Sequence, residues 1–144
     1  MTVVVSDGKT MCADSRMSVG SEVQSVSCRK LHRIGQSVVG FAGAIGIAYA
    51  VIAWLEALYA GEEVGEYPDK DGEALLLILH PNGEINMLDG AGHEFPAGNP
   101  VAIGSGGTIA VTALRCGLSI KDAVKMAVKY DCFCGGKVRS KQCG

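Results

Sequence analysis

Thr2 is the residue of this chain that could act as a nucleophile with a base of its own. If Met1 were removed, Thr2 would carry both a hydroxyl and a free amine that can accept the hydroxyl proton. The small side chain at position two favours removal of Met1. A threonine with β propensity at a frayed strand end would look the same in the sequence, so both interpretations stay open here.

Thr2 precedes a segment whose composition predicts a β-hairpin. Val3, Val4 and Val5 are β-branched and favour an extended backbone. Asp7-Gly8 is a strong signal for a two-residue turn, because both residues tolerate positive φ. Residues 9–14 then return antiparallel to the first strand. Because the hairpin starts next to Met1, we expect no signal peptide before it.

Lys30 is a second residue with chemical potential, on an expected strand from Val26 to Ile34. The period of two places Cys28, Lys30, His32 and Ile34 on one face of that strand. Lys30 therefore shares its face with moderately apolar neighbours. A lysine in such a place needs a carboxylate partner.

Composition limits the classes of function. The chain has 144 residues, which predicts a single domain, and 48% of them are hydrophobic, enough for a substantial core. A net charge of −2 argues against nucleic acid as a partner. We expect all six cysteines to be reduced in the cytoplasm. Cys132 and Cys134, with Cys143 and a histidine, have the wrong spacing for a zinc knuckle, so we expect no metal and no cofactor.

The stretch from Ile34 to Leu55 contains no charged residue and is long enough to span a bilayer. It is interrupted by four glycines and by the turn-like pair Gln36-Ser37. We therefore predict a strand followed by a buried helix and no membrane partner. A small membrane-associated protein using this stretch is an alternative class.

The remaining pattern predicts alternating groups of strands and helices. Helices are expected over 44–60, from Gly104 to Cys116, and from a cap at Ser119 to about Tyr130. Further strands are expected over 38–42, 74–80, 84–88 and 101–103. A final strand is expected to begin within 132–138, and 137–144 is expected to be a loose tail. Several hairpins and few βαβ units predict an α+β domain of antiparallel sheets with helices outside. Helix 44–60 carries only one charge, Glu56, which indicates a second covered face and an oligomer.

Five short segments carry a likeness to a known family. They are Cys12-Ala-Asp-Ser-Arg16, Arg29-Lys-Leu31, Gly40-Phe-Ala-Gly43, Ala102-Ile-Gly-Ser-Gly-Gly107 and Tyr130-Asp-Cys-Phe-Cys-Gly-Gly136. Each is weak alone, but in this order, over nearly the whole chain, they resemble the Ntn-hydrolase family of proteasome β-type subunits and its HslV-like peptidases. The resemblance implies an αββα sandwich of two antiparallel sheets and a threonine-type peptidase.

The resemblance also implies roles for individual residues. Asp14 and Lys30 match the acidic residue and the lysine beside the nucleophile, and a plain ion pair is the alternative for them. Gly43 matches the glycine whose N–H stabilises the oxyanion, although a bend alone could require it. Ser105 and Asp131 match the residues around the threonine amine. Cys134 stands where the family often has serine, and a thiol is the poorer donor.

The sequence departs from the family at its start. Thr2 lies twelve positions before Asp14, about four fewer than in the family, and the chain is also short at its C-terminal end. A hairpin shortened by two residues on each strand would preserve the register and make Thr2 the nucleophile. Without that gap the nucleophile is missing, and the chain would be an inactive, ring-forming structural subunit.

The resemblance also implies partners. They are further copies of the chain in a ring and a peptide or unfolded protein as substrate. It admits an ATP-dependent unfoldase as well, which the residues themselves do not identify.

Overall fold

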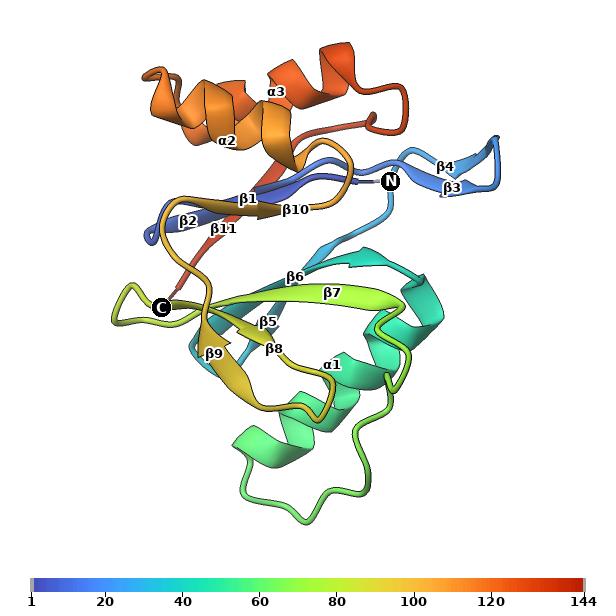
Figure 1. Ribbon diagram of the computed structural model, residues 1–144, viewed down its shortest axis with the longest axis vertical. Helices are drawn as coiled ribbons and strands as arrows, with labels where there is room; N and C mark the ends of the chain where they lie inside the picture. The colour runs from blue at the N-terminus through green and yellow to red at the C-terminus, as the bar shows by residue number, and fades with distance from the viewer. Residues whose placement is uncertain (1, 144) are drawn as a thin grey trace.

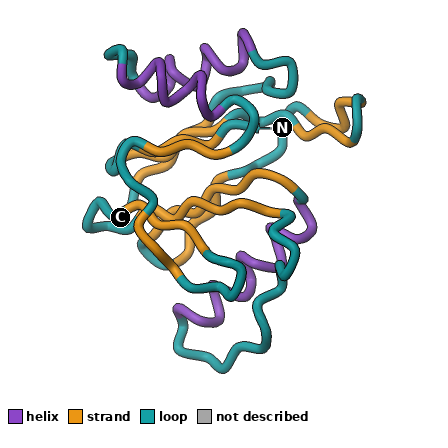
Figure 2. Tube along the Cα trace, in the orientation of Figure 1, coloured by secondary structure: helices purple, strands orange, loops and turns teal. Residues whose placement is uncertain are grey.

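The computed structural model describes residues 2–143, which form four layers (Figure 1). One sheet has the strand order β10-β1-β2-β11, and the other has the order β5-β6-β7-β8-β9. Helices cover the outer face of each sheet, as the colours of Figure 2 make clear. The structure confirms the predicted αββα sandwich of two antiparallel sheets.

The elements have the following bounds. The first sheet contains β10 (Val101–Ile103), β1 (Val4–Ser6), β2 (Thr10–Ala13) and β11 (Arg139–Gln142). The second contains β5 (Leu31–Ile34), β6 (Ser37–Gly43), β7 (Ala74–Leu79), β8 (Ile85–Leu88) and β9 (Glu94–Pro96). A separate hairpin, β3 (Met17–Val19) and β4 (Glu22–Ser25), projects from one end (Figure 1). The helices are α1 (Ile45–Tyr59), α2 (Gly107–Arg115) and α3 (Ile120–Tyr130).

Three apolar clusters hold the layers together. Alternate residues of the strands supply opposite faces, so each sheet packs on both sides. Val4, Met11 and Leu77 lie between the sheets. Phe41 packs under α1 on the second sheet. Val3 packs under α2 and α3 on the first.

The first hairpin forms, but its turn residues are Gly8 and Lys9 instead of the predicted Asp7 and Gly8, because Ser6 pairs with Met11 and Asp7 N–H donates to Thr10 O. Gly8 has a positive φ and Asp7 does not. Val4 pairs with Ala13, and the carboxylate of Asp7 accepts the backbone N–H groups of Lys9 and Thr10 at 2.9 and 2.8 Å. This short turn brings the start of β1 beside the end of β2. Residue 2 therefore lies next to residue 14.

The structure adds to or corrects three local expectations. The strand expected from Val26 begins only at Leu31, because residues 26–30 cross from one sheet to the other (Figure 1). Residues 15–25, which the sequence left open as a loop or an irregular strand, contain the β3–β4 hairpin. The Gly- and Pro-containing stretch 89–100, for which the sequence predicts a loop, contains β9, which pairs with β8 through Met87 and Phe95.

The C-terminal segment was also predicted wrongly. Residues 137–144 are not a loose tail, because β11 pairs with β2 through Arg139–Ala13 and Lys141–Met11, and the strand does not begin within 132–138. Charges at alternate positions resemble a solvated tail, but here they lie along one side of an edge strand. Gly144 lies outside the described residues.

The uncharged stretch 34–55 divides into β6 and α1, as predicted. Within residues 2–143, the structure contains no helix with the length and apolar character needed to cross a bilayer.

Gly40 sets how closely the two sheets approach. A Cβ at this position would lie 2.5 Å from Val4 Cγ1 and 2.7 Å from Met11 Sδ. We expect Gly40→Ala to lower the free energy of unfolding by about 1–3 kcal/mol, because the core must absorb the overlap. Gly46→Ala in α1 is the control. A Cβ added there would have no atom of another part of the protein within 4 Å, so the substitution should be neutral or stabilising. Urea titrations of both variants measure the difference; equal midpoints would contradict this account of Gly40.

Candidate active site

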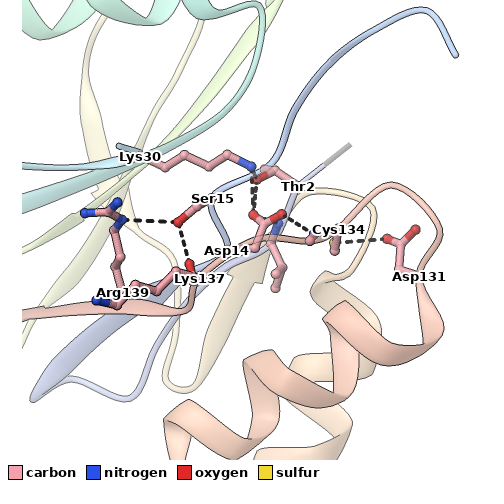
Figure 3. Close-up of polar contacts among 10 residues, drawn as sticks. Thr2, Asp14, Ser15, Lys30, Asp131, Cys134, Lys137 and Arg139 are labelled. Atoms are coloured by element: carbon pink, nitrogen blue, oxygen red, sulfur yellow. Dashed lines mark hydrogen bonds and ion pairs between the residues drawn. The ribbon is translucent and has the colours of Figure 1, made fainter. Parts of the chain in front are cut away.

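Thr2, Asp14 and Lys30 form one buried polar cluster (Figure 3). The Thr2 hydroxyl donates to Asp14 Oδ1 at 2.6 Å, and Lys30 Nζ donates to the same carboxylate oxygen at 2.7 Å. Lys30 Nζ also contacts Thr2 Oγ1. The side chains of Lys30 and Asp14 are 3% and 0% exposed. The hydroxyl therefore lies beside a fixed positive charge and away from bulk water.

Thr2 and Asp14 are in contact although the interval between them in the sequence is shorter than in the family. The Gly8-Lys9 turn closes the hairpin early, and the Asp14 N–H then donates to Val3 O at 3.3 Å. Val3 N–H in turn donates to Asp14 Oδ1 at 3.2 Å. A hairpin that is short on both strands thus keeps the register that places Thr2 on Asp14 and Lys30.

The backbone of Thr2 is held by the turn that starts α2. Gly106 N–H donates to Thr2 O at 3.0 Å. Gly104 has a φ of +91°, and a Cβ there would lie 2.2 Å from Thr2 O. Only glycine permits this approach. The Gly-rich segment 104–107 therefore fixes the first described residue against the sheet.

A second contact to Asp14 comes from the segment after α3. Gly135 N–H donates to Asp14 Oδ2 at 3.0 Å, and Ser15 N–H donates to Gly135 O at 2.9 Å. Arg16 Nη1 donates to Cys132 O at 2.8 Å and packs against Gly135. Sequence reasoning gave Gly135 and Arg16 no role. The only signal was their presence in two of the resembling segments.

Asp131 and Cys134 lie beside this cluster (Figure 3). Burial raises the pKa of Asp131, but hydrogen bonds from the Ser105 side chain, Phe133 N–H and the Cys134 thiol outweigh it and leave the pKa below its ordinary value. The thiol donates to Asp131 Oδ2 at 3.4 Å. The structure thus brings Ser105, Asp131 and Cys134 together, with Asp131 as an anion.

Gly43 lies at the end of β6, on the wall of a pocket of about 530 Å³ that also includes Thr2 and Lys30. Its φ is +95°, and a Cβ there would lie 2.4 Å from Glu73 O. The pocket is lined mainly by apolar atoms, among them those of Phe41 and Ile45.

The two buried thiols, Cys12 and Cys134, do not provide a competing nucleophile. Burial raises the pKa of Cys134 to about 12 and that of Cys12 to about 11, so both remain protonated near neutral pH. All six cysteines are unpaired. Across residues 2–143, no three or more His, Cys, Asp or Glu side chains gather closely enough to hold a metal ion.

Comparison with known proteins gives relatives in sequence and in structure. No family model matches the chain. The chain is 32% identical over 127 residues to the ATP-dependent protease subunit HslV of Hyphomonas neptunium. That match covers 73% of this chain and 65% of the relative, slightly less than two thirds of its length. It is 27% identical to the HslV subunit of Staphylococcus carnosus, over 92% of this chain and 82% of the relative.

Solved structures give the same result. The crystal structure of eukaryotic HslV from Trypanosoma brucei matches with a TM-score of 0.73 and 25% identity, covering 97% of each chain. BPH of Thiobacillus denitrificans, solved in complex with epoxomicin, matches in fold with a TM-score of 0.69 and 18% identity over the full length of both chains. Sequence and fold together support an HslV-like, proteasome β-type relationship, since the chain resembles HslV subunits in sequence and shares their fold.

Proposed function

We propose that this chain is an N-terminal threonine peptidase that hydrolyses peptide bonds, with Thr2 as the nucleophile. The observation that carries the proposal is the Thr2 hydroxyl held by Lys30 and Asp14 at the wall of the 530 Å³ pocket. A hydroxyl needs a nearby base and a stabilised negative charge to attack a carbonyl. The cluster offers the charge, and removal of Met1 would supply the base.

In the proposed reaction, Thr2 Oγ1 attacks the substrate carbonyl carbon and its proton passes to the free Thr2 amine. The negative charge on the carbonyl oxygen is stabilised by the N–H of Gly43, which lies two residues before α1. The C–N bond then breaks, and the leaving amine takes the proton. Water attacks the resulting ester, with the amine again as base, and Thr2 is released.

Lys30 and Asp14 act on the hydroxyl in this scheme. The ammonium group of Lys30 lies next to Thr2 Oγ1 and stabilises negative charge that develops there. Asp14 fixes the lysine through a 2.7 Å contact. Asp131, with Ser105 and Cys134, places a carboxylate where a cationic amine at Thr2 would be stabilised.

The proposal requires a free Thr2 amine, and Met1 lies outside the described residues. Intact mass of protein purified from its natural host is therefore the first test. We expect loss of Met1 and, after incubation with a peptide epoxyketone, one adduct at residue 2. Retained Met1 would end the proposal, because the amine would be part of a peptide bond.

Cys134 gives a prediction specific to this chain. Cys134→Ser replaces a weak thiol donor, 3.4 Å from Asp131 Oδ2, with a hydroxyl that donates more strongly. We expect adduct formation to be preserved or to become a few times faster. Cys134→Val removes the donor and should slow it by about tenfold, the effect of losing about 1.4 kcal/mol. The rate of adduct formation by mass spectrometry distinguishes the two variants; equal rates would show that this residue does not influence the site.

We also propose that the chain assembles as a homo-oligomeric ring in the cytoplasm and receives unfolded protein from an ATP-dependent unfoldase. The relatives' name, ATP-dependent protease subunit, supports such a partner. The outer face of α1 supports assembly, since it exposes apolar residues with Glu56 as its one charge. The exposed members of this face are Tyr49, Ala50, Ala53 and Leu58. Sedimentation that shows a stable 14.9 kDa monomer at micromolar concentration would contradict the ring.

A further inference from the structure

A groove with four basic side chains lies where the two sheets meet at one edge. It has a volume of about 250 Å³ and is lined by Arg29 and Leu31 at the start of β5 and by residues 137–141 along β11. Both β5 and β11 are edge strands of their sheets. We call this the basic groove. Its cations are Arg29, Lys137, Arg139 and Lys141.

The strand register directs these cations into the groove. Arg139 pairs with Ala13 and Lys141 pairs with Met11. Paired residues lie on the same face of a sheet, and Ala13 and Met11 belong to the cluster between the sheets. The two cations therefore extend that inner face at its open edge. Figure 3 shows Lys137 and Arg139 beside Ser15, away from Asp131.

The basic groove has no negative charge of its own. Its lining contains no Asp or Glu, and within residues 2–143 no ion pair joins its four cations to a carboxylate. Arg139 Nε donates only to Ser15 Oγ, at 3.2 Å. Four like charges in one groove repel each other, and this occurs in a chain whose net charge is −2. An anionic surface would relieve that repulsion.

The same chain presents such a surface in residues 61–73, which we call the acidic loop. It contains six of the fifteen acidic residues and a single cation, Lys70. The acidic residues are Glu62, Glu63, Glu66, Asp69, Asp71 and Glu73. All except Asp69 are exposed.

The acidic loop is anchored from beneath. Trp54 Nε1 donates to Gly65 O at 3.0 Å, and the Trp54 and Tyr67 rings pack edge to face. The buried Asp69 accepts the N–H groups of Glu73 and Ala74 at 2.8 and 2.9 Å. The outward carboxylates are thus presented on a loop that is already fixed, which lowers the entropic cost of binding.

We propose that the acidic loop of one copy docks in the basic groove of the next copy. The inference rests on the assembly proposed above and names a contact between neighbouring subunits. The two surfaces are different patches of one chain, so the contact is heterologous, and repetition of it leads to a ring when the rotation closes. Because the contact is made by charges, it weakens as salt increases.

Charge reversal in the groove tests the contact. We expect Lys137→Glu with Lys141→Glu to raise the concentration at which the assembly dissociates at least roughly tenfold, because the groove loses its net positive charge and two carboxylates then face the acidic loop. The matched control is Lys125→Glu with Lys129→Glu, two exposed positions on α3 with the same change in charge. The control should assemble like the wild type. Sedimentation velocity measures the assembly, and circular dichroism verifies that each variant is folded.

A second double variant, in the acidic loop, tests the other surface of the contact. Glu62→Lys with Glu63→Lys reverses two exposed positions of the acidic loop and should also weaken assembly. The two reversals leave the groove of the first variant without net charge and lower the net charge of the loop of the second from −5 to −1, so each variant alone loses most of the attraction. In an equimolar mixture, the carboxylates introduced at positions 137 and 141 of one variant can pair with the ammonium groups introduced at positions 62 and 63 of the other, and we expect the assembly to return in part.

The outcomes separate this contact from the proposed peptidase. Assembly of both reversed variants at the wild-type concentration, or failure of the mixture to assemble, would overturn the groove contact alone. A monomeric wild type would overturn the contact together with the ring. Epoxyketone labelling of Thr2, measured separately on wild-type protein, decides the peptidase proposal and does not depend on these results.

Discussion

Thr2→Ala is expected to abolish labelling by a peptide epoxyketone, with the rate falling at least about a thousandfold. The variant lacks the oxygen that forms the covalent bond, whereas Lys30, Asp14 and the pocket remain. Mass spectrometry of the intact protein measures the adduct. Thr2→Ser is the control, because it keeps the hydroxyl beside Lys30 Nζ and should still be labelled.

The same substitution should cost some stability. Thr2 is 2% exposed and its hydroxyl donates to Asp14, so Thr2→Ala should lower the free energy of unfolding by about 1 kcal/mol. From sequence alone, little packing was expected to depend on this residue. Equal adduct formation in Thr2→Ala and wild type would place the reactive group elsewhere and contradict the proposed nucleophile.

Lys30→Met is expected to abolish labelling and to destabilise the fold by about 3 kcal/mol. It removes the cation from a buried ion pair and leaves the Asp14 carboxylate without a counter-charge. The loss is at the lower end of the usual range because Thr2 Oγ1 and the N–H groups of Val3 and Gly135 still donate to Asp14. Urea unfolding measures the change.

A second substitution identifies the cause of that loss. Asp14→Asn in the Lys30→Met background removes the unpaired charge and retains an acceptor, so it should recover part of the lost stability but no labelling. Lys70→Met, at an exposed ion pair with Glu66, is the control and should change stability by less than about 0.5 kcal/mol. If Lys30→Met were as mild as Lys70→Met, the buried pair would not support the fold.

The sequence predicted the parts of the site that depend on local signals. Gly8 and the valines of β1 indicated the first hairpin, although its turn lies one residue later than predicted, and resemblance assigned roles to Asp14 and Lys30. The sequence alone left open whether a hairpin of this length brings Thr2 to that pair. The answer depends on cross-strand register, Val4 against Ala13, which is a tertiary property.

Long-range contacts explain most of what the sequence could not predict. β11 was predicted as a tail because its basic residues carry no apolar pattern, yet its partner is β2, more than 120 residues earlier. Gly135 gives no sign in the sequence that its N–H will meet Asp14. Strand pairing and backbone donors of this kind are set by topology and leave little trace in side-chain type.

The contact between Gly135 and Asp14 also has a consequence for biosynthesis. The two residues are 121 positions apart, so one carboxylate joins the beginning of the chain to a segment made near its end. A nascent chain still lacking residue 135 has Thr2, Asp14 and Lys30 but not the loop that completes their surroundings. Translation order therefore delays the finished cluster until most of the polypeptide has been synthesised.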